Sequence, residues 1–287
     1  TLNYSPNEDL NMKLIASTYS AMESENYDIQ GQYWIGLLET NPGSEQSGDV
    51  ISNQGVGTYI EHARNDFYSQ VFNIDHKGAY KNDMFTLKWG ARYQHQHFDD
   101  FINEWEMVDS AGFSLPHPAD SIGSPNPPHP LFEIQHLSKA HNILDINNID
   151  GFVHNEWTFN AENADIITLS LGLRANYWGY NKKVNVSPRA GVAYKPGWSN
   201  NMLFRLSGGV YVQPPFYREL RMFDGSLVTP EKASTQKSYQ VVFTHEYNFK
   251  AWDRPFVLTS ELYYKYLKDI IPYEVDNIRI RYYADQR

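Results

Sequence analysis

The sequence contains no cysteine in 287 residues. Disulfides, thiolate nucleophiles and cysteine-based zinc clusters are therefore excluded, although this absence does not fix the compartment. No apolar run approaches the roughly 18 residues that a membrane-spanning helix needs. The formal net charge is −10, and no stripe of lysine or arginine interrupts it. This balance argues against nucleic acid as a partner.

Signals at the two ends of the sequence are also missing. The chain begins TLNYSPNEDL, without the basic start and apolar run of a signal peptide. It ends at RYYADQR without an obvious terminator, so we expect both ends to continue in a longer protein. The mean hydropathy of −0.57 alone would suggest a soluble chain. It cannot exclude a transmembrane barrel, because half of every barrel strand faces a polar lumen.

Aromatic residues are abundant. They make up 15% of the sequence, with 21 Tyr, 15 Phe and 7 Trp. Such a bias suits the aromatic girdles of a barrel, where an amphipathic ring sits between lipid and water. A tyrosine-rich soluble β-protein such as a lectin is the alternative on composition alone.

Alternation of apolar and polar residues is clearest between Ile166 and Val212. A period of two indicates strands, because successive side chains point to opposite faces of a sheet. The apolar positions of the first strand are Ile167, Leu169, Leu171, Leu173, Ala175 and Tyr177. These segments match the roughly 9–11 residues of a membrane-crossing strand rather than the 5–6 typical of soluble proteins.

The same pattern recurs along the chain and predicts about ten or eleven strands. Short connections are predicted near 20–26, 76–83, 161–165, 196–201 and 250–255. Longer ones are predicted near 40–57, 98–147, 179–186 and 214–235. Short turns that alternate with long loops are typical of outer-membrane barrels. We therefore predict an all-β fold, an antiparallel up-and-down transmembrane β-barrel, in preference to a soluble sandwich.

Several runs in one order then resemble a known family. They are NEDLNMKLIASTYSAMESENYDIQGQYWIG, YIEHARNDFYSQVFNIDHKGAY, WGARYQHQHFDD with EWEMVDSAGFSLP, and VSPRAGVAYKP with ELYYKYLKDIIPYEVDN. Together they resemble the barrel of a TonB-dependent receptor of the bacterial outer membrane. The likeness is greatest to the Bacteroidetes type, which carries a carboxypeptidase-regulatory-like domain before its plug.

The resemblance implies an incomplete barrel. In that family 22 strands surround an N-terminal plug, and a TonB box on the plug engages the energy-coupling complex of the inner membrane. Neither plug nor TonB box is visible in this sequence. Residues 1–287 would form one partial barrel domain, a middle portion of about 10–11 strands, with extracellular loops at about 40–57, 98–147 and 214–235.

The resemblance also implies a function. The protein would import a scarce solute such as a siderophore, glycan or peptide, by loop capture and energised displacement of its own plug. The expected partners are the solute, the lipid bilayer, the TonB complex and, as in some relatives, a surface lipoprotein. No enzyme activity and no cofactor are expected. The alternatives are a passive porin or structural barrel, and a soluble carbohydrate-binding β-sandwich.

Cationic residues on the polar face of the strands form the first candidate group. In a barrel this face lines the lumen, where unpaired buried charge is costly. Pairing with plug carboxylates is therefore favoured over an anionic ligand. The residues are Lys88, Arg92, Arg174, Arg189, Lys195 and Arg205.

The second candidate group lies in the predicted long loops. Aromatic and arginine side chains dominate binding energy at interfaces, so these residues are candidates for ligand contact, with loop packing as the alternative. They are Trp105, Phe113, Tyr217, Arg218, Glu219 and Arg221.

Metal binding and catalysis were weighed as well. Residues His95, His97, Asp99 and Asp100 are of ligand type, but polar strand and loop residues are the simpler interpretation, and no metal site is predicted. Glu104, Glu106 and Asp109 do not establish the carboxylate separation that glycoside hydrolysis needs. The sequence has no phosphate-binding loop, serine-hydrolase or zinc-protease motif. No catalytic residues are predicted.

Overall fold

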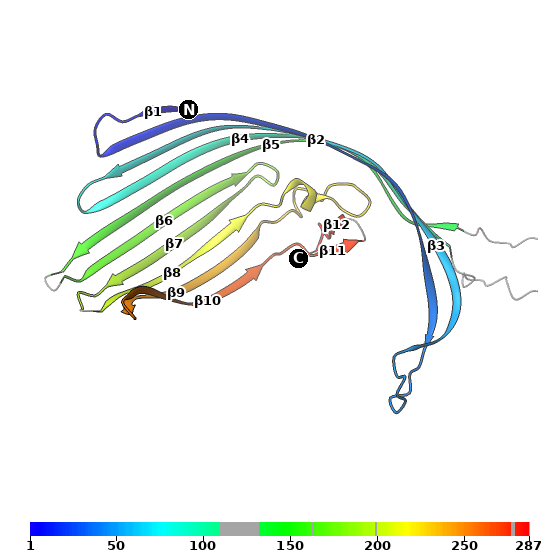
Figure 1. The fold of residues 1–287 in the computed structure, drawn as a ribbon. Coiled ribbons are helices and arrows are strands. Elements are labelled where there is room, and N and C mark those ends of the chain that lie inside the picture. Colours follow the sequence, from blue (N-terminus) through cyan, green and yellow to red (C-terminus); the bar gives the residue numbers. More distant parts are fainter. Residues whose placement is uncertain (110–131, 162–163, 199, 277–278, 287) are drawn as a thin grey trace, which may run out of the picture.

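The computed structural model describes residues 1–109, 132–161, 164–198, 200–276 and 279–286. Ten strands, β1 to β10, form one antiparallel sheet in chain order, so each strand pairs with its neighbours in sequence (Figure 1). The all-β, up-and-down prediction is confirmed. Within these ranges no helix is long and apolar enough to cross a membrane.

The elements are bounded as follows. The sheet comprises β1 (Leu2–Tyr4), β2 (Leu10–Leu38), β3 (Val50–Lys81), β4 (Phe85–Asp109), β5 (Phe132–Asn160), β6 (Ile166–Trp178), β7 (Lys183–Lys195), β8 (Asn201–Gln213), β9 (Gln236–Ala251) and β10 (Arg254–Lys268). A short 3₁₀ helix, η1 (Tyr217–Leu220), lies between β8 and β9. A separate hairpin consists of β11 (Tyr273–Asp276) and β12 (Arg279–Tyr282).

The strands fall into two length classes. Strands β2 to β5 contain 25 to 32 residues, whereas β6 to β10 contain 13 to 16. A membrane crossing needs only about 9–11 residues, so the long strands exceed the length of a crossing, and Figure 1 shows them extending well beyond the ends of the shorter strands.

The predicted turn at Ser20–Asn26 is wrong. Strand β2 runs through this segment and pairs with β3 from Leu10 to Ile35 without a shift in register. Beyond the membrane both faces of a strand can meet water, so the alternation fades. A polar segment in which apolar residues do not recur at every second position is therefore predicted as a turn, even where it forms a strand.

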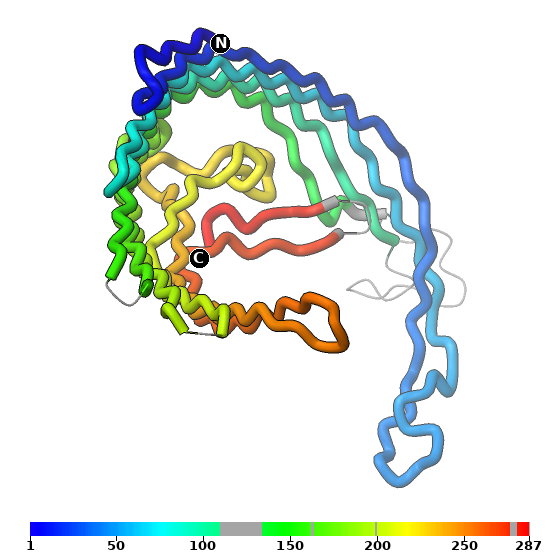
Figure 2. Tube along the Cα trace, turned by 60° about the vertical axis from the view of Figure 1, so that its left-hand side comes forward, coloured from blue at the N-terminus to red at the C-terminus, as the bar shows by residue number. Residues whose placement is uncertain are grey.

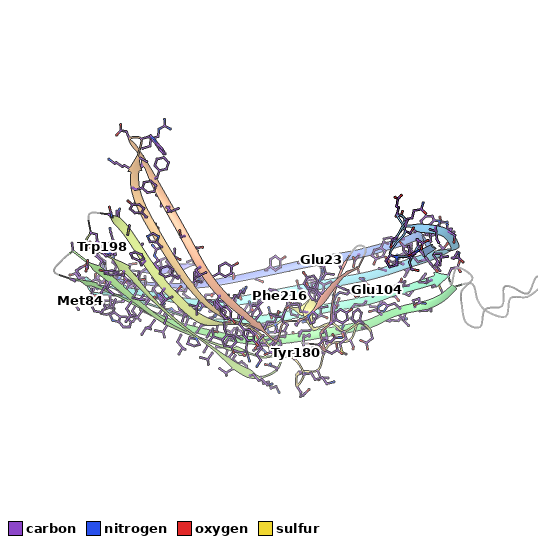
Figure 3. All side chains as sticks on the ribbon, turned by 90° about the horizontal axis from the view of Figure 1, so that it is seen from below. Glu23, Met84, Glu104, Tyr180, Trp198 and Phe216 are labelled. Atoms are coloured by element: carbon purple, nitrogen blue, oxygen red, sulfur yellow. The ribbon has the colours of Figure 1, made fainter. Side chains whose placement is uncertain are left out.

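Several predicted connections are shorter in the structure. The loop predicted at 98–147 is wrong over much of its length, because β4 continues to Asp109 and β5 begins at Phe132. Likewise β3 begins at Val50, and only 179–182 separate β6 from β7. In contrast, residues 214–235 do connect β8 to β9. Met84 and Trp198, which belong to two of the short turns, lie at the same end of the sheet (Figure 3).

The sheet curves around a hollow, which gives it a convex and a concave face (Figure 2). Leu171 and Leu173 of β6 lie on the convex face and are 45% and 47% exposed. Their neighbour Arg174 lies on the concave face with Asp150 of β5. An apolar outer face and a polar inner face are the pattern of an outer-membrane barrel wall.

Residues 214–235, called the inner loop below, lie on the concave side together with the β11–β12 hairpin (Figure 2). Here the inner loop packs against the wall and forms the hydrophobic core. The wall contributes Phe98, Ile146 and Trp178, and the inner loop contributes Leu220 and Val228. The core therefore lies inside the hollow, toward the end with the longer connections.

Candidate functional site

A buried carboxylate fastens the inner loop to the wall. The Tyr217 hydroxyl donates to Asp100 Oδ2 at 2.8 Å, and the Arg221 guanidinium donates to Asp100 Oδ1 at 2.5 Å. Asp100 belongs to β4, is 1% exposed, and lies beyond the first roughly 11 residues that would cross the membrane. Burial raises the pKa of its carboxyl, and the positive charge of Arg221 opposes that rise. Burial also raises the pKa of Tyr217, which keeps its hydroxyl a donor.

Apolar packing and a turn complete the docking of the inner loop. Leu220 and Val228 are each 1% exposed, and the Val228 amide donates to the Leu220 carbonyl oxygen at 2.8 Å. The loop reverses at Gly225, where φ is +85° and a Cβ atom would lie 2.9 Å from Ser138 Oγ. Glycine satisfies both requirements because it has no Cβ.

The docked inner loop bounds a cavity of about 640 Å³, called the upper pocket. Its walls come from β2 to β5, the inner loop and β12. Figure 3 shows two of its residues, Glu23 and Glu104, on the strands near the loop. The main polar and aromatic lining residues are Glu23, Glu25, Asn65, Phe67, Asp100, Glu104, His136, Arg218, Arg221, Phe223, Arg281 and Tyr282.

The upper pocket carries charges of both signs. Arg218 forms an ion pair with Glu23. The Asn65 amide donates to Glu25 Oε2 at 3.2 Å and to Glu104 Oε1 at 2.6 Å. Such a surface suits recognition of a polar solute by hydrogen bonds. No role was predicted for Glu23 or Glu25, because the predicted turn covered both.

The structure divides the ligand-contact candidates of the inner loop. Arg218 and Arg221 line the upper pocket, whereas Tyr217 and Glu219 hold the loop in place. Glu219 Oε2 accepts from the Phe216 amide at 2.8 Å and from the Gln236 side chain at 3.2 Å. Loop packing, the alternative weighed for this group, describes the contacts of Tyr217 and Glu219.

The two remaining candidates are not part of this site. Trp105 was placed in a loop, but it lies in β4, where its ring stacks on His62 at a centroid distance of 4.7 Å. Its register partner in β5 is Leu137, and both face outward. Phe113 lies outside the described residues.

Three of the cationic candidates make contacts with neighbouring strands of the sheet. Arg92 pairs with Asp75 at 2.5 Å, and Arg174 pairs with Asp150 at 2.8 Å. Arg189 lies over the Tyr211 ring at 4.4 Å. All members of the group except Arg92 are exposed. Pairing of this group with a plug stays a prediction.

The histidines of β4 point to the other side of the wall. His97 Nδ1 lies 2.9 Å from Asp145 Oδ1, and His95 Nδ1 lies 2.9 Å from Asn147 Oδ1. Among the residues that the structure describes, no group of three or more histidine, aspartate or glutamate side chains is arranged to hold a metal ion.

Comparison with known proteins gives a family and two structural neighbours. A family model described as TonB dependent receptor-like, beta-barrel matches residues 1–285. The RagAB peptide importer in the closed-closed state is 12% identical with a TM-score of 0.45, covering 94% of this chain and 29% of that chain. The copper transporter OprC is 15% identical with a TM-score of 0.44, covering 95% and 45%. No curated protein matches the sequence. The chain thus spans less than half the length of either neighbour.

Proposed function

Because the chain belongs to the TonB-dependent receptor-like β-barrel family, we propose that the whole protein imports a scarce solute across the bacterial outer membrane. The chain supplies part of the barrel wall and one loop that folds inward. A plug, the TonB complex that pulls on it, and a surface lipoprotein are the proposed partners. The Bacteroidetes type with a carboxypeptidase-regulatory-like domain is the proposed full-length architecture.

The inner loop is the observation that carries this proposal. It packs into the hollow of the wall through Asp100 and bounds the upper pocket with Arg218 and Arg221. In the proposed mechanism the solute binds in the upper pocket, and the plug is then displaced under force. The protein positions the solute and forms or breaks no covalent bond.

Energised uptake by the full-length protein tests this function. The protein would be produced in a bacterial outer membrane with its own TonB partner. Cells would be given labelled short peptides, oligosaccharides, ferric siderophores or cobalamin. We expect uptake of one class to stop when the TonB box is deleted. Uptake that persists without the TonB box would favour a passive porin.

Paired variants relate uptake to the upper pocket. Arg218→Ala should reduce binding of the imported class, because this side chain lines the pocket opposite Glu23. Trp105→Ala is the matched control, since Trp105 faces outward from the same wall. Equal binding by both variants would contradict capture in the upper pocket.

A further inference from the structure

A second cavity of about 560 Å³ lies on the concave face and is called the lower pocket. It is built on strands β5 to β10. Gln213, Pro214 and Gln236, where the inner loop leaves and rejoins the wall, belong to its lining. The inner loop therefore borders the upper pocket, and its two ends border the lower pocket.

Register places two cations of the lower pocket on one row of the sheet. Arg189 pairs with Gly209, Gly209 pairs with Gln240, and Gln240 pairs with Lys265. Three strand spacings separate the Cα atoms of Arg189 and Lys265, which is about 14 Å along the sheet. Both side chains are long and rise from a concave surface, so their charged ends can approach one anion together.

Arg189 is held in a defined orientation. A Cβ atom at Gly209 would lie 2.9 Å from Arg189 Cγ, so the glycine leaves room for the arginine side chain to cross toward β8. There the guanidinium stacks over the Tyr211 ring at 4.4 Å. Stacking uses the face of the guanidinium and leaves its N–H edge available for an anion.

The lower pocket carries an excess of positive charge. Its acidic residue Asp150 already accepts hydrogen bonds from Arg174 at 2.8 Å and from Asn176 at 3.1 Å. In the described part of the chain, no ion pair joins Arg189 or Lys265 to a carboxylate. The sequence as a whole has a net charge of −10, so this excess is a local feature. A concave surface with one sign of charge concentrates ions of the opposite sign.

We propose that the lower pocket is a second station on the import path, where Arg189 and Lys265 bind a carboxylate or phosphate group of the solute. The proposal rests on the import function proposed above and adds a chemical class to it. Arginine offers paired donors that match carboxylate and phosphate oxygens. Gln240 lies between the two cations on the same row; its side-chain amide donates one N–H to Ser238 Oγ at 2.8 Å, and the second N–H is a further donor.

Pyrophosphate is the probe for this station. Titration calorimetry on the purified full-length protein in detergent should give saturable binding. Arg189→Gln and Lys265→Gln should each weaken that binding by about tenfold or more, the usual scale of a lost charge-assisted hydrogen bond. Lys88→Gln is the matched control, because Lys88 lies on the same row, through His154 and Gly172, but outside the lower pocket. It should bind pyrophosphate as the unsubstituted protein does.

Three results would overturn the station. The first is unchanged binding in both variants. The second is an equal loss in Lys88→Gln, which would indicate a general effect of lumen charge. The third is faster hydrogen exchange of the plug in Arg189→Gln with pyrophosphate binding intact, which would make plug carboxylates the partners.

Uptake measured in parallel separates this proposal from the import function. A protein that imports a solute in a TonB-dependent way but binds no pyrophosphate overturns the station and leaves the function standing. A protein that binds pyrophosphate in the expected variant pattern without such uptake supports the anion site and overturns the import function.

Discussion

At the scale of single residues, Asp100 has the most demanding environment in the structure. Its carboxylate is 1% exposed and is shared by Tyr217 and Arg221 of the inner loop. A buried ion pair contributes little net stability, but the loss of one partner leaves an uncompensated charge. The ion pair of Asp100 with Arg221 therefore fixes where the inner loop docks, while the apolar core supplies the favourable free energy of docking.

The coupling between Asp100 and Arg221 can be measured with a double-mutant cycle. We expect Asp100→Ala and Arg221→Ala each to weaken docking of the inner loop by about 3 kcal/mol. The double variant should lose less than the sum, with a coupling of about 2 kcal/mol. Hydrogen exchange of the Val228 amide, which donates to the Leu220 carbonyl, reports docking. Strictly additive losses would show that the pair is no anchor.

Acid should loosen another residue-scale contact, far out on β2. Hydrogen bonds from Arg64 and then His62 lower the pKa of Asp28 below its ordinary value of 3.8. Because the pKa of Asp28 is lowered in the folded state, its ionised carboxylate stabilises the fold fully above pH 3.8. That stabilisation is lost as the pH falls through the pKa of Asp28 in the folded protein. Hydrogen-exchange protection of the backbone amides around Asp28, corrected for the intrinsic pH dependence of exchange, should therefore fall below pH 3.8.

Asp28→Asn is the control for this acid effect. It lacks the titrating group, so its protection in the same part of β2 should show no such step. If the unsubstituted protein and Asp28→Asn lose amide protection at the same pH, other carboxylates cause the effect. The contact is exposed, and added salt should weaken it.

The sequence predicted which face a residue occupies better than what it contacts. Alternation placed Arg174 and Arg189 on the inner face, because the period of two is a geometric property of any strand. Contacts such as Asp100 with Tyr217 depend on how the inner loop folds back over the wall. Nothing in local sequence encodes that approach, so Asp100 was weighed only as a metal ligand.

At the scale of elements, the inner loop and the long strands account for the main differences from prediction. Residues 214–235 were predicted as a loop, but their inward folding comes from a few apolar side chains within a polar sequence. The outer parts of β4 and β5 were predicted as a loop, and β2 was divided by a predicted turn, because alternation weakens where both faces of a strand meet water. Sequence therefore predicts the membrane-crossing part of a strand more reliably than its extension.

Docking of the inner loop should depend on Leu220. Leu220→Ala removes a side chain that is 1% exposed and should cost about 3 kcal/mol of docking free energy. Phe216→Ala, at a position 66% exposed one turn away, should cost far less. Protease susceptibility of the inner loop in the intact protein distinguishes the two variants. Equal susceptibility would mean that the loop is held mainly by the Asp100 contacts.

At the scale of the molecule, the described sheet has two open edges. Strand β10 pairs only with β9, and most of β2 pairs only with β3. Unpaired backbone groups in hydrocarbon cost several kcal/mol each. We therefore expect the strands that close the barrel to come from elsewhere in the full-length protein.

Closure can be read from gel mobility. The full-length protein in outer-membrane extracts should run as a compact fast band that slows on boiling. Residues 1–287 produced alone should show a single mobility, because the open edges have no partners. A heat-modifiable band from these residues alone would show that they close by themselves. A full-length protein that is soluble without detergent would instead favour the β-sandwich.

The unequal strand lengths would also control what can touch this protein from outside the cell. In the proposed outer membrane, the extra residues of β2 to β5, about 15 per strand, would stand as a screen about 35–40 Å high once strand tilt is included. A small nutrient can diffuse around such a screen. A large macromolecule would be held off on the side of β2 to β5 and would approach β6 to β10 more easily.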